Sequence, residues 1–505
     1  MRPSPAADDV LRFREAIARH FGLQFDDSKL GFLTDVLWRR LDAGRDGGSD
    51  YLARLERGPT TQEVAGLAPE LTVPETYFFR NIDQFRAFSE VVLPERMRAR
   101  GAHRVLHILS AGCATGEEPY SAAIAVRELG LDPSWEVSIR AIDLNLTVLE
   151  RAARGLYSTW AMREMPPATQ ARWFRQTGRD LHLDDAIRAR VSFSQRNLAD
   201  EDAELWRPGY FDVVFCRNVL MYFTPRAAQA VVDRISRSLA PGGFLFLGHA
   251  ETLRGLSHDF HLCHTHGTFY YRRKAADELE VAHARTDELD PSFPALTIAP
   301  ADLLADSWVE AIGRAAERIR ALSRQHDPTP GRPGPAGRGW DLRSPLELLR
   351  QERYGDALGA LEALPPESAR DPDVRLLEAV LLAHSGALPG AEVACRALLE
   401  LDELNAGAHY VLALCREGTG DPAGATEHDQ VAAYLDPSFA MPRLHLGLMA
   451  RRGGDQDGAC RQLSQALDLI QREDSSRLLF FGGGFNREAL TALCRDALAA
   501  CGGGA

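Results

Sequence analysis

Residues 106–121 read Leu-His-Ile-Leu-Ser-Ala-Gly-Cys-Ala-Thr-Gly-Glu-Glu-Pro-Tyr-Ser, a stretch that contains three successive structural signals. The apolar run predicts a buried strand, Gly112 and Gly116 predict a tight loop, and the residues that follow predict the start of a helix. A glycine loop between a strand and a helix is where α/β sheets bind nucleotides. The alternative interpretation of the glycine spacing is a tight turn that holds no ligand.

Two acidic residues at the start of this helix narrow the class of ligand. A phosphate-binding loop needs a lysine and bare N–H groups here, whereas Glu117 and Glu118 would repel a pyrophosphate. The same carboxylates suit a ligand with an ammonium and a sulfonium group, such as S-adenosylmethionine (SAM). The next predicted strand ends in Asp143, a position at which an acid accepts hydrogen bonds from ribose hydroxyls. The alternative for the glutamate pair is charge complementarity at a helix N-terminus.

The regions around this loop differ in their apolar pattern. Apolar positions at helical spacing, such as Val10, Phe13 and Ile17, predict helices over residues 10 to about 58. Between residues 101 and 274, short apolar runs alternate with helical stretches, which indicates a parallel sheet with crossover helices and an α/β fold. The predicted strands are residues 104–109, 137–142, 211–215, 242–247 and 268–271.

The last third of the chain contains an internal repeat of 34 residues. Small residues recur at this interval in three columns, as they do where two antiparallel helices of a tetratricopeptide (TPR) repeat cross. The columns are Ala357, Ala391, Ala425 and Ala459; Gly386, Gly420 and Gly454; and Ala379, Ala413 and Gly447. An all-α TPR domain is therefore predicted, with an irregular alanine-rich bundle as the alternative. Residues 327–339 contain four prolines and four glycines, which is typical of a linker.

The overall composition excludes several classes of protein. An apolar fraction of 45% over 505 residues is typical of a globular chain rather than a disordered or collagenous one. The absence of an apolar run of about 18 residues argues against membrane insertion, and an N-terminus without a signal-peptide pattern predicts the cytoplasm. A net charge of −13 argues against nucleic-acid binding. The cysteines are scattered and the histidines of residues 258–266 lack a second ligand pair, so no metal site is predicted.

Four motifs in the first half of the chain resemble those of the chemotaxis receptor methyltransferases, the CheR family. They are Thr-Tyr-Phe-Phe-Arg at 76–80, the glycine loop at 110–121, Phe-Cys-Arg-Asn-Val-Leu-Met-Tyr-Phe at 215–223 and Gly-His-Ala-Glu-Thr at 248–252. The resemblance implies a SAM-dependent methyltransferase core of Rossmann-like fold behind an N-terminal helical subdomain. It also implies that the protein methylates glutamate side chains of chemoreceptors during chemosensory adaptation.

The resemblance also implies roles for individual residues. Arg80, Arg217 and Tyr222 are expected at the reacting centre, and Pro74 stands where family members often have an asparagine. For Arg217, a buried structural ion pair is the alternative. The residues expected to bind SAM are Thr76, Arg80, Gly112, Glu118, Asp143, Asn197, Leu198, Cys216 and Arg217.

The repeat, the linker and the resemblance together predict five segments. These are an N-terminal helical subdomain (1–70), a methyltransferase domain (71–274), a flexible linker (275–343), TPR repeats (344–470), and a C-terminal helical cap and tail (471–505). Expected partners are a methyl-accepting chemoreceptor as substrate and an unidentified protein bound through the repeats. The resemblance further implies a small β-subdomain within residues 150–195, which some family members use to grip a receptor tail.

The expected substrate agrees with the residues of the motifs. A glutamate side chain with a pKa of about 4.3 is already ionised at neutral pH, so its methylation needs no general base. The motifs accordingly contain no obvious catalytic histidine or aspartate. One alternative function is a catalytically weak SAM-binding adaptor that scaffolds a chemosensory complex through its repeats. Another alternative, methylation of nucleic acid, is disfavoured by the charge balance.

Overall fold

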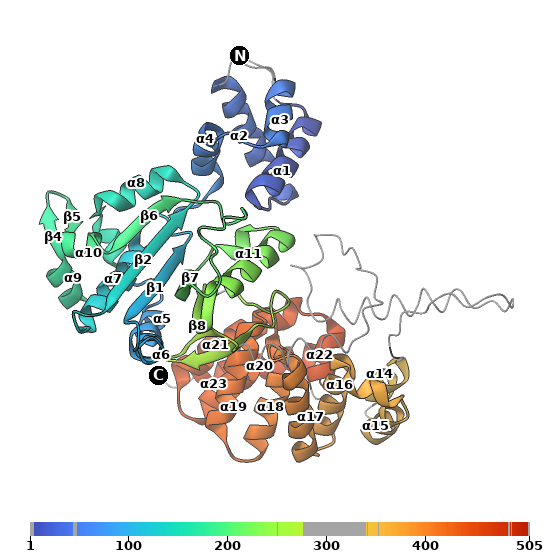
Figure 1. Cartoon of the computed structure of the whole chain (residues 1–505). Helices are drawn as coiled ribbons and strands as arrows, with labels where there is room; N and C mark the ends of the chain where they lie inside the picture. The colour runs from blue at the N-terminus through green and yellow to red at the C-terminus, as the bar shows by residue number, and fades with distance from the viewer. Residues whose placement is uncertain are drawn as a thin grey trace. The chain divides into compact units, whose positions relative to one another are not determined.

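The structure is a computed structural model that describes residues 5–43, 48–249, 251–275, 340, 342–351, 353–482, 485 and 487–502 (Figure 1). The chain divides into two compact units, one before and one after the predicted linker, and each is described by itself. Nearly all of the predicted linker 275–343, including residues 327–339, lies outside the described residues.

The first unit begins with four helices that pack around their own small core. They are α1 (Ala7–Phe21), α2 (Leu30–Ala43), α3 (Gly48–Arg57) and α4 (Thr61–Leu71). Val10, Phe13 and Ile17 of α1 are buried together with Leu33 and Val36 of α2, so the apolar spacing of this region correctly predicted which helix faces are internal.

A seven-stranded sheet forms the centre of the first unit. Its spatial order is β6-β2-β1-β7-β8-β10-β9, and β10 runs antiparallel to both of its neighbours. The prediction of a parallel sheet is therefore wrong at this edge, where a tight hairpin rather than a crossover helix joins β9 to β10. The strands are β1 (Val105–Ala111), β2 (Glu136–Asp143), β6 (Val191–Gln195), β7 (Phe211–Cys216), β8 (Leu239–Leu247), β9 (Phe260–Thr265) and β10 (Thr268–Arg273).

Helices cover the sheet, and an aromatic cluster fills the space beneath them. Phe215 of β7 stacks on Phe246 of β8 with ring centroids 4.8 Å apart, and Phe85 and Phe88 pack against Phe215 at 5.7 and 5.2 Å. The helices are α5 (Ile82–Ala87), a π-helical turn (Phe88–Val92), α6 (Leu93–Ala99), α7 (Glu117–Glu128), α8 (Leu146–Arg154) and α11 (Pro225–Ser238), shown in Figure 1.

A second, small sheet lies between β2 and β6 in the sequence. It consists of β3 (Leu156–Tyr157), β5 (Asp180–Leu183) and β4 (Phe174–Thr177) in that spatial order, all antiparallel. Three short helices flank it in the sequence: the 3₁₀ helix η3 (Thr159–Met162), α9 (Pro167–Trp173) and α10 (Asp185–Arg188). This sheet lies in the range in which the resemblance implies a β-subdomain, and its β4–β5 hairpin is only four residues deep.

The second unit is entirely helical in its described residues. Helices that begin 34 residues apart, at Pro372, Ala406 and Ala440, alternate with helices that begin at Leu388, Pro422 and Gln456. The helices are α14 (Arg343–Arg350), α15 (Tyr354–Glu362), α16 (Pro372–His384), α17 (Leu388–Leu401), α18 (Ala406–Gly418), α19 (Pro422–Leu435), α20 (Ala440–Arg452), α21 (Gln456–Arg472), α22 (Ser475–Phe481) and α23 (Arg487–Gly502).

The small residues of the repeat have the positions that the 34-residue spacing predicted. A Cβ added to Gly447 of α20 would lie 2.6 Å from Cγ of Leu463 in α21, so this helix pair crosses at a glycine. Gly386, Gly420 and Gly454 follow the first helix of each pair with φ of +80°, +81° and +83°, a conformation that favours glycine. The prediction of TPR-like helix pairs is confirmed.

Candidate functional site

The glycine loop lies at the carboxyl end of β1, between the loops that follow β2 and β7. Gly112 and Gly116 have φ of +75° and +92°, which glycine adopts without strain. A Cβ on Gly112 would lie 2.5 Å from Cγ2 of Val219, and one on Gly116 would lie 2.8 Å from Cβ of Ala152. The loop therefore needs glycine partly because the loop after β7 and helix α8 pack directly on it. In an open α/β sheet, the crevice at this point is the usual ligand site.

A buried ion pair connects the start of α7 with the end of β7. Nη1 of Arg217 lies 3.3 Å from Oε2 of Glu118, and the hydroxyl of Ser110 donates to Oε1 of the same carboxylate at 2.7 Å. Burial raises the pKa of Glu118, and the charge of Arg217 opposes that shift. Nη2 of Arg217 also donates to the main-chain carbonyl of Arg80. Three of the sequence motifs thus meet at one guanidinium group.

This guanidinium retains one donor that the protein does not use. Nε of Arg217 is buried, since the whole residue is only 7% exposed. This nitrogen has no hydrogen-bond partner among the described residues. Burial, and the nearby charge of Arg80, lower the pKa of Arg217. A buried N–H without an acceptor is costly, so a ligand that supplies one is favoured here. The carboxylate of SAM has the required chemistry, and the residues present fit that cofactor.

The Asp143 carboxylate faces the glycine loop from the end of β2. Its Oδ2 accepts from the backbone N–H of Ala114 at 2.9 Å, and its Oδ1 accepts from that of Asn145 at 2.9 Å. These bonds orient the group, and each oxygen keeps capacity for a further donor such as a ribose hydroxyl. Burial raises the pKa of Asp143, and the backbone hydrogen bonds oppose that rise.

Glu251 is a functional candidate that the sequence analysis did not identify, although its motif was quoted. Its Oε2 accepts the backbone N–H groups of Asn218 at 2.6 Å and Gly248 at 2.7 Å. Its Oε1 accepts those of Val219 at 2.8 Å and Met221 at 3.3 Å. One buried carboxylate therefore holds the loop that follows Arg217. An acid four residues beyond a strand end, in the motif Gly-His-Ala-Glu-Thr, was the available signal.

Arg80 and Tyr222, which the sequence predicted at the reacting centre, are more exposed than Glu118 and Arg217. The guanidinium of Arg80 lies 5.7 Å from the ring centre of Tyr77, and its Nη1 donates to the carbonyl of Glu75 at 3.3 Å. Tyr222 is 40% exposed, and its carbonyl accepts from the backbone N–H of Gln24, which follows α1. The loop with Tyr222 thus also ties the N-terminal helices to the sheet.

The other predicted SAM-binding residues differ in their burial and in their hydrogen bonds. The side-chain amide of Asn197 donates within the protein, to the carbonyl of His20 at 2.8 Å and to Oδ1 of Asp200 at 2.9 Å. Leu198 and Cys216 are buried, and burial raises the pKa of the Cys216 thiol well above its usual value. Thr76 is half-buried in the described structure. The thiol is therefore a packing group rather than a nucleophile.

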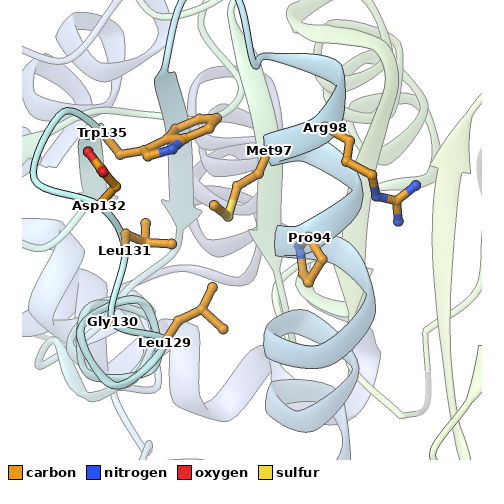
Figure 2. A pocket seen from close by; sticks show the side chains of 8 residues that line it. All are labelled: Pro94, Met97, Arg98, Leu129, Gly130, Leu131, Asp132 and Trp135. Carbon is orange, nitrogen blue, oxygen red and sulfur yellow. The ribbon is translucent and has the colours of Figure 1, made fainter.

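A separate pocket lies beside the start of β2, at the opposite end of that strand from the glycine loop (Figure 2). It has a volume of about 500 Å³ and lies between α6 and the connection from α7 to β2, with Met97 and Trp135 pointing into it. β2 begins beside this pocket, whereas the glycine loop lies near the other end of the strand.

The described residues include no cluster of three or more His, Cys, Asp or Glu side chains that could hold a metal ion. Nor do they include a helix long and apolar enough to cross a membrane.

Comparison with known proteins places the four motifs in one family. Residues 74–269 match the model of the CheR methyltransferase SAM-binding domain. The chain is 34% identical over 263 residues to chemotaxis protein methyltransferase 2 of Vibrio cholerae, covering 50% of this chain and 88% of that protein. It is 30% identical over 424 residues to the probable biofilm formation methyltransferase WspC of Pseudomonas aeruginosa, covering 84% and 90%.

Several solved structures are similar to part of this chain, and one of them is a TPR protein. The crystal structure of TTC0263, a TPR protein of Thermus thermophilus, is 20% identical to this chain, of which it covers 32%, and 98% of its own length is matched with a TM-score of 0.24. At that score the likeness adds nothing to what the helix pairing already shows.

Proposed function

This chain belongs to the CheR family of SAM-dependent methyltransferases, and from that premise we propose that it methylates glutamate side chains of chemoreceptors. The products are glutamate methyl esters that adjust receptor signalling. The observation that best supports this proposal is that the guanidinium of Arg217 donates to the main-chain carbonyl of Arg80, so that two arginines belong to one partly buried site. Guanidinium groups are the side chains best suited to bind carboxylates.

The protein's residues have distinct tasks in this proposal. When bound, SAM supplies an electrophilic methyl group. Asp143 would accept from its ribose, Glu118 would lie near its ammonium, and Nε of Arg217 would pair with its carboxylate. Thr76, Gly112, Asn197, Leu198 and Cys216 would complete the binding site, the last two around the adenine.

In this proposal Arg80 positions the substrate carboxylate, and Tyr222 is expected beside it. The substrate carboxylate is already ionised, so no residue has to remove a proton. Holding the carboxylate in one orientation can account for roughly 7–11 kcal/mol of the activation barrier. Because Arg217 is paired with Glu118, Arg80 is the guanidinium that remains available to orient the substrate.

The proposal is tested by transfer of labelled methyl from SAM to receptor-containing membranes. Release of volatile methanol by base identifies a carboxyl methyl ester, and replacement of the receptor's methylated glutamates should abolish it. Arg80→Ala should reduce transfer at least 100-fold. Arg86→Ala is the matched control, because that side chain is 57% exposed and forms an exposed ion pair with Asp83 at 3.0 Å. SAM binding without any ester formation would instead support the adaptor function.

The short β4–β5 hairpin bears on how receptors are recognised. A hairpin four residues deep offers little edge for an added peptide strand. We therefore expect direct recognition of the receptor's methylation region. Micromolar binding of an isolated receptor-tail peptide would contradict this expectation.

The helical unit has a different proposed role, the recruitment of a protein partner. Stacked helix pairs form an extended surface for peptides or helices, and a linker rich in proline and glycine can hold such a partner at high local concentration. A fragment that ends at Lys274 should therefore still bind SAM and methylate receptors in solution. A folded fragment that binds SAM but transfers no methyl would show that the repeats are part of the enzyme.

A further inference from the structure

The short helix α22 lies across the first helices of the repeats. The ring of Phe481 is 5.8 Å from that of Tyr410 in α18 and 4.8 Å from that of Phe439, which immediately precedes α20. The Tyr410 hydroxyl donates to the Phe481 carbonyl at 3.4 Å. Phe480 and Phe481 are both almost fully buried. A segment of the chain itself thus covers part of the row of first helices, the kind of surface on which repeat arrays bind partners.

A glycine makes room for the inserted ring. A Cβ on Gly407 in α18 would lie 2.9 Å from Cζ of Phe481 and 3.0 Å from Cδ2 of Leu376 in α16. The repeat does not require glycine here, because the equivalent positions 34 residues away are Asp373 and Met441. Glycine is disfavoured within helices. Its presence at this one position is explained by the aromatic side chain that occupies the space.

A buried ion-pair cluster fixes how α22 lies. Nη2 of Arg477 donates to Oδ2 of Asp436 at 2.8 Å, and its Nε lies 3.1 Å from Oε1 of Glu473. The guanidinium carbon is 4.1 Å from the ring centre of Phe439. Desolvation offsets much of the attraction in a buried ion pair, so such a pair contributes orientation more than affinity. The basic residue and the two aromatics, one helical turn apart, form a recognisable set.

The helices on either side of α22, which are α21 and α23, are held together by contacts that do not involve α22. At the start of α23, Arg487 donates to the carbonyls of Ile470, Gln471 and Glu473 at 2.8, 2.6 and 2.6 Å. These bonds cap the C-terminus of α21 and pair α23 with it. Withdrawal of α22 from the first helices would therefore leave the pairing of α21 and α23 in place.

We propose that α22 is an internal ligand of the TPR array. The external partner is then a protein segment of the same chemistry, a short helix with an arginine followed one turn later by two adjacent aromatic residues. This inference rests on the proposed role of the array in binding a protein. If α22 leaves its place only 1% of the time, the apparent affinity for such a partner falls about 100-fold. Binding of the partner is thus controlled by the chain itself.

The test uses a fluorescent peptide with the sequence of residues 474–482, added to the full-length protein. The double variant Phe480→Ala/Phe481→Ala should bind the peptide at least tenfold more tightly than the wild type does. Adding Gly407→Leu to that variant should abolish binding, because the new side chain fills the space of the ring. A peptide with both phenylalanines replaced by alanine should bind neither protein. Equal peptide affinity of a folded double variant and the wild type would overturn the proposal.

A second measurement on the intact wild-type protein covers the case in which the double variant does not fold. Backbone amides of α22 should exchange with deuterium at least tenfold faster than those of α21, because α22 can open locally. Equal exchange rates would make α22 part of the global folding unit and overturn the proposal. A concentration-dependent dimer with exchanged α22 segments would also overturn it, since the partner would then be a second copy. Methyl transfer to receptors is a separate readout, so either failure leaves the proposed enzyme function unaffected.

Discussion

Replacing Glu251 with glutamine should both destabilise the first unit and slow methyl transfer. The substitution keeps the shape of the side chain but turns one of its oxygens into an NH₂ group that faces two backbone N–H donors. If the group at the Oε2 position changes, the bonds from Asn218 at 2.6 Å and Gly248 at 2.7 Å are lost. Hydrogen bonds to a charged group contribute about 1.5–3 kcal/mol each, so the loss of two should cost about 3–6 kcal/mol.

Two assays follow from this magnitude. A loss of about 3 kcal/mol should lower the unfolding temperature of the methyltransferase unit by at least about 6 °C in calorimetry. Because the loop that carries Arg217 and Tyr222 would shift, kcat/KM should fall about 100-fold. Glu204→Gln is the matched control, since this side chain is 63% exposed and pairs with Arg140 at 3.7 Å and Arg196 at 3.5 Å. A Glu251→Gln protein that melts and turns over like the control would refute the assigned role of the carboxylate.

Three further predictions concern the cofactor site and the helical unit. Gly112→Ala should weaken SAM binding about tenfold in calorimetry, because a Cβ would lie 2.5 Å from the neighbouring loop; unchanged affinity would show that the loop can move aside. Asp143→Ala should cost about 1–3 kcal/mol of SAM affinity, and a folded variant that binds normally would remove this residue from the site. In the helical unit, Nδ1 of His445 is 2.6 Å from Asp429 and Nε2 is 2.7 Å from Glu417. Although burial alone would lower it, these two carboxylates raise the pKa of His445. A group with a raised pKa stabilises the fold fully below its unfolded pKa of about 6.5 and loses this contribution as the pH rises through the higher folded pKa. The unit should therefore lose stability as the pH rises above about 6.5, and His445→Phe should flatten that slope in denaturant titrations.

The parts of the fold that were predictable are those with a local periodic signal. The 34-residue columns identified the helix pairs because a small residue is needed wherever two helices cross closely, as at Gly447. The strands β1, β2 and β7 were predictable within two residues, because each is a short apolar run between turns. β6 was missed, since three of the five residues in its sequence Val-Ser-Phe-Ser-Gln are polar and the strand lies at the edge of the sheet. The reversed strand β10 was assigned to a parallel sheet because strand direction leaves no trace in composition.

The candidate site also has features that the sequence predicted and features that only the folded structure shows. Motif order and spacing are properties of the sequence alone, and they were sufficient to assign the family and the cofactor. They also gave Glu118, Asp143 and Arg217 as candidate site residues, and these roles remain predictions. Pairing of Glu118 with Arg217, the four backbone bonds of Glu251 and the insertion of Phe481 against Gly407 join residues that are distant in sequence, or depend on how a loop is folded. Such contacts form only when the sheet order and the helix stacking have brought their elements together. Tertiary structure alone therefore determined which buried charges are satisfied, which donor is left for a ligand, and which part of the repeat surface the chain itself covers.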